Sequence, residues 1–315
     1  MNYCKLGLFV FLGLTVVCGF LIFLRDHVIE CADTTAAITD LSSLYAATEE
    51  ISAAEDRLMG DVKPAEIITR LYGDVQHIAI VFDGLPERPL TARMLDVLKK
   101  HDAPAVFFVE GQNAANQPET IALIQEEEQE IGNYTFVGIS SAEKLPKKRL
   151  LAELCRTQMA VSALSPQTPS LFRAAHTAYT DDLLRALRAA GIDYAVKENV
   201  RHSAGSFRDA EAAAAFAVNV PAGSIIAIKF SRPVDPHATA PIQTEERPAV
   251  DKKPTLKDPS PVKHAPPHAD AADEPDWMLT AFEAAGMRVI SVHEFRKIRY
   301  IPEELPTGEG GKGGL

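Results

Sequence analysis

The chain has few cysteines, and only one of them lies beyond residue 31. Cys4, Cys18 and Cys31 fall in or beside an N-terminal apolar segment, and Cys155 stands alone in the rest of the sequence. A disulfide within the body of the chain therefore has no second partner, and a cysteine-based zinc site is excluded there. The pattern also excludes a small secreted protein that depends on disulfides for its stability.

Basic residues are fewer than acidic residues. The sequence has 32 Lys and Arg against 43 Asp and Glu, which gives a formal net charge of −11. Nucleic-acid binding requires a basic surface, so this balance argues against a nucleic-acid partner. Hydrophobic residues make up 46% of the 315 residues, which is enough to form the core of one ordinary to large domain.

Charged residues are absent from residues 6–24, LGLFVFLGLTVVCGFLIFL. As a helix, this stretch is long enough to cross the hydrocarbon core of a bilayer. The sequence RDHVIEC that follows offers no small-residue cleavage site, and Glu30 stands before Cys31 where lipoprotein processing needs a small residue. We therefore expect residues 1–31 to be an uncleaved membrane anchor, with the domain extracytoplasmic, either periplasmic or at the cell surface.

The texture of the sequence changes at His77. Residues 32–75, rich in Ala, Thr, Ser and Glu, predict a partly helical stalk. Beyond them, short apolar runs alternate with segments of helical period, which predicts a mainly parallel sheet or barrel with helices outside. The expected strands are residues 77–82, 105–109, 170–173, 192–197, 224–230 and 288–292, and the expected helices are residues 91–104, 118–131, 147–164, 180–191 and 277–286.

Two of the expected helices carry signals at both ends. Pro118 stands near the start of one, and Gly132 would lie just past its end. Thr180 is the expected N-cap of the other, and Gly191 is expected to end it.

The alternation stops at residues 231–276. Ten of the 21 prolines fall there, among charged residues and histidines. Such a composition cannot bury a core, so it predicts an extended, disordered insertion. The folded domain is therefore expected to comprise residues 76–230 and 277–300, followed by a flexible tail over residues 301–315.

Charged side chains follow several of the expected strands. Asp83 ends the run IVFD, Arg173 follows SLF, and Lys229 ends SIIAIK. The chemistry of parallel α/β folds is found at the carboxyl ends of the strands, so we expect these side chains to share one edge of the sheet.

The segment from IAIVFDGLPERP to GNYTF resembles the polysaccharide deacetylases, carbohydrate esterase family 4, whose domain is also called the NodB-homology domain. The resemblance runs from about His77 to Ser231 and resumes at Trp277. It implies the distorted (β/α) barrel of that family. It also implies hydrolysis of acetamide groups on peptidoglycan or a chitin-like polysaccharide with a bound zinc or cobalt ion.

The resemblance also identifies substitutions at the family's metal ligands. In the family motif Phe-Asp-Asp-Gly-Pro, the first aspartate is the catalytic base and the second binds the metal. The sequence VFDGLP keeps the base as Asp83 and has Gly84 at the second position. The two histidines of the family's second motif correspond to Tyr134 and Gly138. All three protein ligands are replaced, so we expect no metal cofactor.

The remaining motifs are altered as well. The family's Arg-Pro-Pro-Tyr resembles RAAH, which keeps Arg173 as the partner of the base and places His176, a candidate acid, at the tyrosine position. Lys229 replaces the histidine that acts as general acid, and Lys197 replaces a tryptophan of the acetyl pocket. Tyr134, Lys197 and Lys229 are therefore candidate ligand-binding residues.

Amide hydrolysis by this route needs a metal to activate water, a base and an acid. Only the base remains, so Asp83 is expected to be vestigial, solvent-facing and ion-paired with Arg173. The leading interpretation is a membrane-anchored, catalytically inactive envelope protein that binds a glycan or an unidentified protein partner. One alternative is an N-deacetylase with a rearranged site, and another is an envelope interaction or scaffold protein.

Overall fold

The computed structural model describes residues 47–71, 76–230 and 273–298, and the described residues from Thr48 onward belong to one compact unit. The expected membrane anchor, the proline-rich insertion up to residue 272 and the tail lie outside the described residues. Within the described ranges, no helix is both long and apolar enough to cross a membrane.

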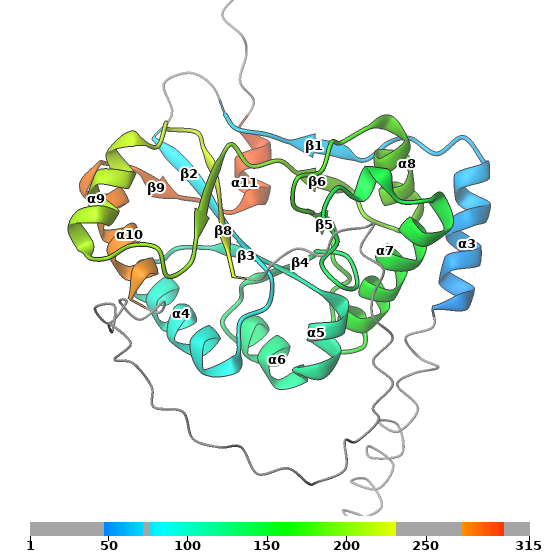
Figure 1. The fold of residues 1–315 in the computed structure, drawn as a ribbon, viewed down its shortest axis with the longest axis horizontal. Helices are drawn as coiled ribbons and strands as arrows, with labels where there is room; N and C mark the ends of the chain where they lie inside the picture. The colour runs from blue at the N-terminus through cyan, green and yellow to red at the C-terminus, as the bar shows by residue number, and fades with distance from the viewer. Residues whose placement is uncertain (1–46, 72–75, 231–272, 299–315) are drawn as a thin grey trace, which may run out of the picture. The chain divides into compact units, whose positions relative to one another are not determined.

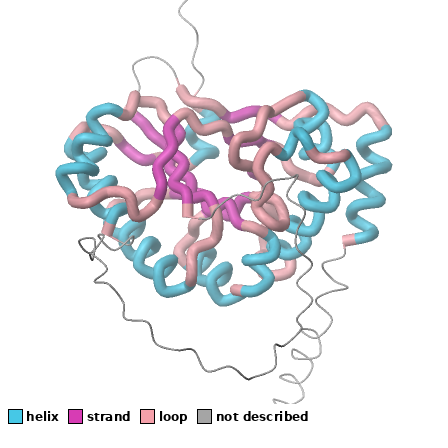
Figure 2. Tube along the Cα trace, viewed as in Figure 1, coloured by secondary structure: helices cyan, strands magenta, loops and turns pink. Residues whose placement is uncertain are grey.

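The strands form one curled parallel sheet, drawn in Figures 1 and 2. Its order is β1-β6-β5-β4-β3-β2-β8-β7, with β9 paired to the start of β2, and every pairing is parallel. Because β1 and β7 end this order without pairing to each other, the sheet is an open half-barrel. The strands are β1 Glu66–Ile68, β2 His77–Asp83, β3 Ala105–Val109, β4 Glu130–Asn133, β5 Leu171–Phe172, β6 Tyr194–Val196, β7 Val200–Ser203, β8 Ile225–Lys229 and β9 Arg288–Val289.

The helices lie mainly around the outside of this sheet (Figure 1). They are α3 Thr48–Met59, α4 Arg88–Lys100, α5 Gly111–Asn116, α6 Pro118–Glu126, α7 Lys147–Ser162, α8 Asp181–Ala189, α9 Ala210–Asn219, α10 Glu274–Ala284 and α11 Val292–Lys297, with a 3₁₀ turn, η1, at Ala142–Lys144. The expected parallel α/β architecture is therefore confirmed.

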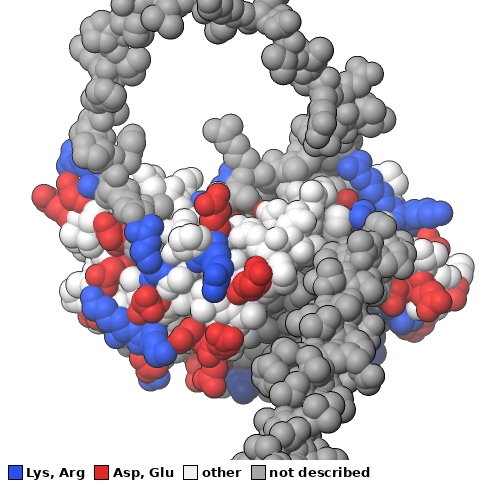
Figure 3. Space-filling model, turned by 90° about the horizontal axis from the view of Figure 1, so that it is seen from below, with Lys and Arg blue, Asp and Glu red and all other residues white. Residues whose placement is uncertain are grey.

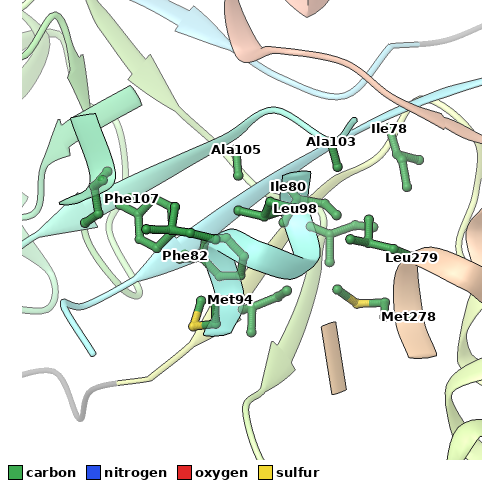
Figure 4. Close-up of a cluster of buried hydrophobic side chains, with 14 of the residues drawn as sticks. Ile78, Ile80, Phe82, Met94, Leu98, Ala103, Ala105, Phe107, Met278 and Leu279 are labelled. Carbon is green, nitrogen blue, oxygen red and sulfur yellow. The ribbon is translucent and has the colours of Figure 1, made fainter. Parts of the chain in front are cut away.

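Alternation along the strands separates two apolar clusters, as the period of a pleated strand requires. On β2, Ile78, Ile80 and Phe82 join the outer cluster, where Figure 4 shows them beside side chains of α4 and α10. Ala79 and Val81 belong to the inner cluster. Asp83 continues the inner parity, so the sequence alternation itself directs its carboxylate into the half-barrel.

The inner cluster is closed by α11. Phe295 of that helix is fully buried there, together with Phe108 of β3 and Tyr134, which follows β4. Large side chains therefore pack inside the half-barrel below the carboxyl ends of the strands.

The stalk expected over residues 32–75 needs correction. Its second half contains α3, and β1, which pairs in parallel with β6 and adds an edge strand to the sheet. Ile68 and Leu71 are buried in the inner cluster. The domain therefore begins before residue 76. The run EII did not stand out from a segment rich in Ala, Thr, Ser and Glu, so the sequence did not indicate this strand.

Gly132 does not end a helix, as the sequence analysis expected. Helix α6 ends at Glu126, Glu128 adopts a left-handed conformation with φ of 54°, and Gly132 lies within β4. A Cβ atom at this position would lie 2.4 Å from the ring of Phe108, so close packing between strands explains the glycine. The other expected helix ends are confirmed: Thr180 caps α8, and Gly191, with φ of 84°, follows its C-cap.

Helix α10 begins at Glu274, three residues before the expected position at residue 277. Glu274 is buried and accepts hydrogen bonds from the backbone N–H groups of Gly205 and Phe207. Pro275 falls in the first turn of the helix, where proline is well tolerated. By composition Pro275 belongs with the proline-rich insertion, so the predicted boundary of the helix was too late.

Candidate functional site

The candidate site lies where the carboxyl ends of β2, β8 and β7 meet. Asp83 is in register with Lys229 of β8, and Lys229 is in register with Ser203 of β7. Asp83 and Lys229 are the last residues of their strands. The sheet therefore places a carboxylate, an ammonium group and a hydroxyl on neighbouring strands at one level.

Asp83 and Arg173 form the expected ion pair. The guanidinium donates from Nε to Oδ1 at 2.6 Å and from Nη2 to Oδ2 at 2.9 Å. The two residues are only 3% and 1% exposed, so the expectation of a solvent-facing aspartate was wrong. Since Arg173 engages both carboxylate oxygens, Asp83 has its strongest acceptor positions occupied within the protein.

Glu198 completes this cluster, and the sequence analysis did not identify it. Its carboxylate accepts hydrogen bonds from Arg173 Nη1 and Arg201 Nε. Burial alone would raise the pKa of Glu198, but the two guanidinium groups outweigh it and lower that pKa below its usual value. Glu198 stands two residues after β6, so its place at a strand end was the available signal.

Opposing effects act on the ion pair itself. Burial raises the pKa of Asp83, and Arg173 opposes that rise. For Arg173, burial alone would lower the pKa of the guanidinium, but Asp83 and Glu198 together raise it above its usual range. Arg173 therefore remains a cation.

Tyr134 and Gly138 are the residues that the resemblance aligns with the family's two histidine ligands. The Tyr134 ring is fully buried, and its hydroxyl has no hydrogen-bond partner among the described residues. Burial, with a smaller effect of the Asp83 charge, raises the pKa of the Tyr134 phenol far above its usual value. Gly138 has φ of 74°, and a Cβ atom there would lie 3.1 Å from Cγ of Glu110.

Glu110 is a second residue that the sequence analysis did not identify. It follows β3, is 4% exposed, and accepts hydrogen bonds through Oε2 from Leu85 N at 3.0 Å and Asn113 Nδ2 at 3.1 Å. The first of these bonds fixes the loop that follows Asp83. Glu110 therefore has a structural task beside the site.

The residues present do not fit a divalent metal ion. Gly84 and Gly138 carry no donor side chain, and Tyr134 would offer only a protonated phenol. Across the described part of the chain, no three His, Cys, Asp or Glu side chains are grouped so that they could hold a metal. Zinc and cobalt sites in proteins need several nitrogen or oxygen ligands at short range, and this donor set lacks them.

A small pocket of about 190 Å³ opens over the ion pair. Asp83, Arg173, His176 and Lys229 line it, as do Arg201 and Ser203, so four of the six predicted site residues meet around one space. His176 is exposed, and its backbone is in the left-handed region with φ of 52°.

Tyr134 and Lys197 do not line this pocket. The backbone N–H of Lys197 bonds to Ile68 of β1, and its side chain is exposed. Of the two lysines expected to bind a ligand, only Lys229 lines the pocket, and Arg201 lines it as well. Direct pairing of β6 with β1, which the sequence did not reveal, accounts for the difference.

Comparisons with known proteins agree on one family. A family model described as polysaccharide deacetylase matches residues 72–195. A chitooligosaccharide deacetylase from Bradyrhizobium sp. (strain ANU 289) is 33% identical over 138 residues, which make up 42% of this chain and 63% of that protein. The peptidoglycan-N-acetylmuramic acid deacetylase PdaC of Bacillus subtilis is 32% identical over 106 residues, 34% of this chain and 22% of that protein. The chain therefore spans less than two thirds of the length of these relatives.

The fold also matches solved structures. A carbohydrate esterase family 4 pseudoenzyme from Bacillus anthracis superposes with a TM-score of 0.54 at 16% sequence identity, over 75% of this chain and 70% of that one. At this identity the likeness establishes the shared fold.

Proposed function

We propose that the chain is a catalytically inactive member of the polysaccharide deacetylase family that binds a glycan of the cell envelope. The observation that carries this proposal is the donor set at the family's metal positions, where Gly84, Tyr134 and Gly138 stand. Without a metal, the site has no group that lowers the pKa of a water molecule toward neutrality.

The state of Asp83 supports the same proposal. A general base must reach the proton that it removes, with an oxygen free to accept it. Both oxygens of Asp83 are bonded to a buried guanidinium. At the position of the family's general acid, Lys229 has a primary amine on a flexible chain in place of the imidazole.

The pocket at the carboxyl edge of the sheet supports the proposal of glycan binding, because it offers a place for part of a ligand. Relatives of the chain are named for chitooligosaccharide and for peptidoglycan. On the face shown in Figure 3, acidic and basic side chains are interspersed, without the basic stripe that a nucleic-acid partner would require. We further propose that residues 1–31 anchor the protein in a membrane, with the domain on the extracytoplasmic side.

Two measurements on the purified full chain test this function. Acetate release from peptidoglycan and from chitooligosaccharides should stay at background when zinc or cobalt is added, while a chitooligosaccharide deacetylase in the same assay releases acetate. Binding to insoluble peptidoglycan should be saturable. Metal-dependent acetate release would refute the loss of activity, and an absence of glycan binding would refute the binding role.

One observation favours the alternative of a rearranged N-deacetylase. His176 lines the same pocket as Asp83, so an imidazole and a carboxylate share one space. In that case the wild-type chain would release acetate, and both His176→Ala and Asp83→Asn would abolish the release. If the pseudoenzyme proposal holds, neither substitution changes the background.

A further inference from the structure

Lys229 is the one pocket-lining cation to which the described structure assigns no counter-charge. Arg173 pairs with Asp83 and Glu198, and Arg201 pairs with Glu198. Within the described ranges, no carboxylate lies within ion-pair distance of the Lys229 ammonium group. Asp83 is its register neighbour, but both carboxylate oxygens of Asp83 are held by Arg173.

The charges around the pocket therefore do not cancel. Arg173, Arg201 and Lys229 are cationic side chains of the lining, and Asp83 is the one carboxylate among the described residues that line the pocket. Glu198, outside the lining, supplies a second carboxylate that pairs with both guanidinium groups. The two carboxylates balance the two guanidinium groups, which leaves one positive charge on the half-buried Lys229. A cation in a partly enclosed site attracts an anion more strongly than a cation on an open surface.

The dimensions of the pocket limit what the anion can be. Its volume of about 190 Å³ is below the roughly 300–1,000 Å³ of pockets that enclose whole small ligands. It fits one substituent of a ligand, and the rest of the ligand would lie outside. Ser203, in register with Lys229 on β7, adds a hydroxyl that can donate a hydrogen bond to an anionic oxygen.

We propose that this pocket receives a carboxylate borne on a sugar, with Lys229 as its ionic partner and Ser203 as a hydrogen-bond donor. The inference rests on the proposed glycan-binding function and specifies its ligand class. In this arrangement the lysine at the family's general-acid position serves recognition, and an acidic sugar is selected over a neutral one.

The experiment compares two tetrasaccharides that differ only in the lactyl ethers that bear the carboxylates. One is chitotetraose, which is neutral, and the other alternates N-acetylglucosamine with N-acetylmuramic acid, whose lactyl group carries a carboxylate. Calorimetry with the full chain should give at least about tenfold tighter binding of the acidic tetrasaccharide, equal to about 1.4 kcal/mol. Methyl esterification of its carboxylates should remove the difference, and the preference should weaken as salt is added.

Variants locate the effect. Lys229→Gln should abolish the preference while binding of the neutral sugar persists, and Lys229→Arg, which keeps the charge, should retain it. Lys197→Gln is the matched control, because Lys197 is an exposed lysine that does not line the pocket. The preference should survive that substitution.

Other outcomes would contradict either the anion site, the glycan-binding function or the assignment of the ligand to a sugar. Equal binding of the two tetrasaccharides would overturn the anion site and leave glycan binding in place. Failure of both to bind would instead remove the proposed function. Inorganic phosphate that competes as strongly as the acidic sugar would overturn the assignment to a sugar, and loss of preference in Lys197→Gln would show that general surface charge is responsible.

Discussion

Asp83 and Arg173 illustrate how a buried ion pair depends on both of its members. Each charge has lost nearly all contact with water, and each is compensated by the other at 2.6 and 2.9 Å. Removal of one member leaves an uncompensated charge in the interior, at a cost of about 3–5 kcal/mol. Arg173 also neutralises Glu198, so its loss leaves two carboxylates without their main partner.

We therefore predict that Asp83→Asn destabilises the domain by about 3 kcal/mol and that Arg173→Gln costs more, up to about 5 kcal/mol. The double variant should lose less than the sum of the two, because the pair is already broken by either change. Urea unfolding curves measure all three. Arg201→Gln is the control: it removes an exposed partner of Glu198 and should cost less than about 1 kcal/mol. Additive losses in the double variant would contradict a coupled pair.

At the scale of elements, His101 at the C-terminal end of α4 forms hydrogen bonds with two carboxylates of α10. Nε2 of His101 lies 2.7 Å from Asp276 Oδ1, and Nδ1 lies 2.7 Å from Glu283 Oε1. Asp276 is also bonded to Lys100 at 2.7 Å. Burial alone would lower the pKa of His101, but the hydrogen bonds to Asp276 and Glu283 outweigh it and raise that pKa above its usual value.

This contact makes the stability of the domain depend on pH. Because the pKa of His101 is raised on folding, its contribution is fully present below the unfolded value of about 6.5 and is lost as pH rises through the folded value. We predict that, between about pH 6 and about pH 8.5, the wild type loses about 1 kcal/mol more stability than His101→Gln. Unfolding in urea at both pH values provides the measurement. The same change with pH in both proteins would show that the histidine contributes nothing.

Strand β4 contains a glycine that the neighbouring strand requires. A Cβ atom at Gly132 would lie 2.4 Å from the ring of Phe108, which is fully buried and cannot move aside freely. We predict that Gly132→Ala destabilises the domain by about 1–3 kcal/mol through overpacking. Gly60→Ala is the control, since a Cβ there would meet only the Arg57 carbonyl oxygen at 3.4 Å. Equal melting temperatures for the two variants would refute the packing argument.

For the whole molecule, the sequence predicted the longer elements best. AVFFV was located at its observed bounds, and α8 was located by its N-cap Thr180 and by Gly191, because apolar period and end signals agreed there. Strands β1 and β7 were missed: VRHS of β7 holds one apolar residue, and EII of β1 lies in a segment whose composition predicted a stalk. Their places are decided by pairing with distant strands, β6 and β8.

The residues of the candidate site also fall into those that the sequence predicted and those that it did not. Asp83, Arg173, His176 and Lys229 were found because each lies at or beside a strand end or on a motif position. Glu198 and Glu110 were not, because their roles come from contacts across the sheet, with Arg173 in one case and the backbone of Leu85 in the other. Burial of Asp83 was also beyond the sequence, since it depends on Arg173, which follows β5 and contacts both carboxylate oxygens.

The extent of the domain is a property of the whole molecule, and α3 and β1 decide it. Helix α3 packs against α7 and α8, and Arg57 donates to the carbonyl oxygen of Ala189 at 2.6 Å. Strand β1 is bonded to β6, and Gly223 accepts a backbone hydrogen bond from Leu71 at 2.8 Å. These contacts join residues 48–71 to a core formed by residues more than a hundred positions later.

A chain that begins at Thr48 keeps these contacts, and one that begins at residue 76 loses them. We therefore expect the shorter chain to have the lower free energy of unfolding. Loss of buried Ile68 and Leu71 removes about 1.5–3 kcal/mol for each side chain, so we predict a loss of about 4 kcal/mol. For a domain of this size that corresponds to a fall in melting temperature of about 10 °C. Differential scanning calorimetry on the two chains measures it. Ile68→Ala in the longer chain should lower the free energy of unfolding by about 2–4 kcal/mol, because it leaves a cavity without exposing the edge of β6. Equal melting temperatures for the two chains would mean that residues 48–71 are a stalk after all.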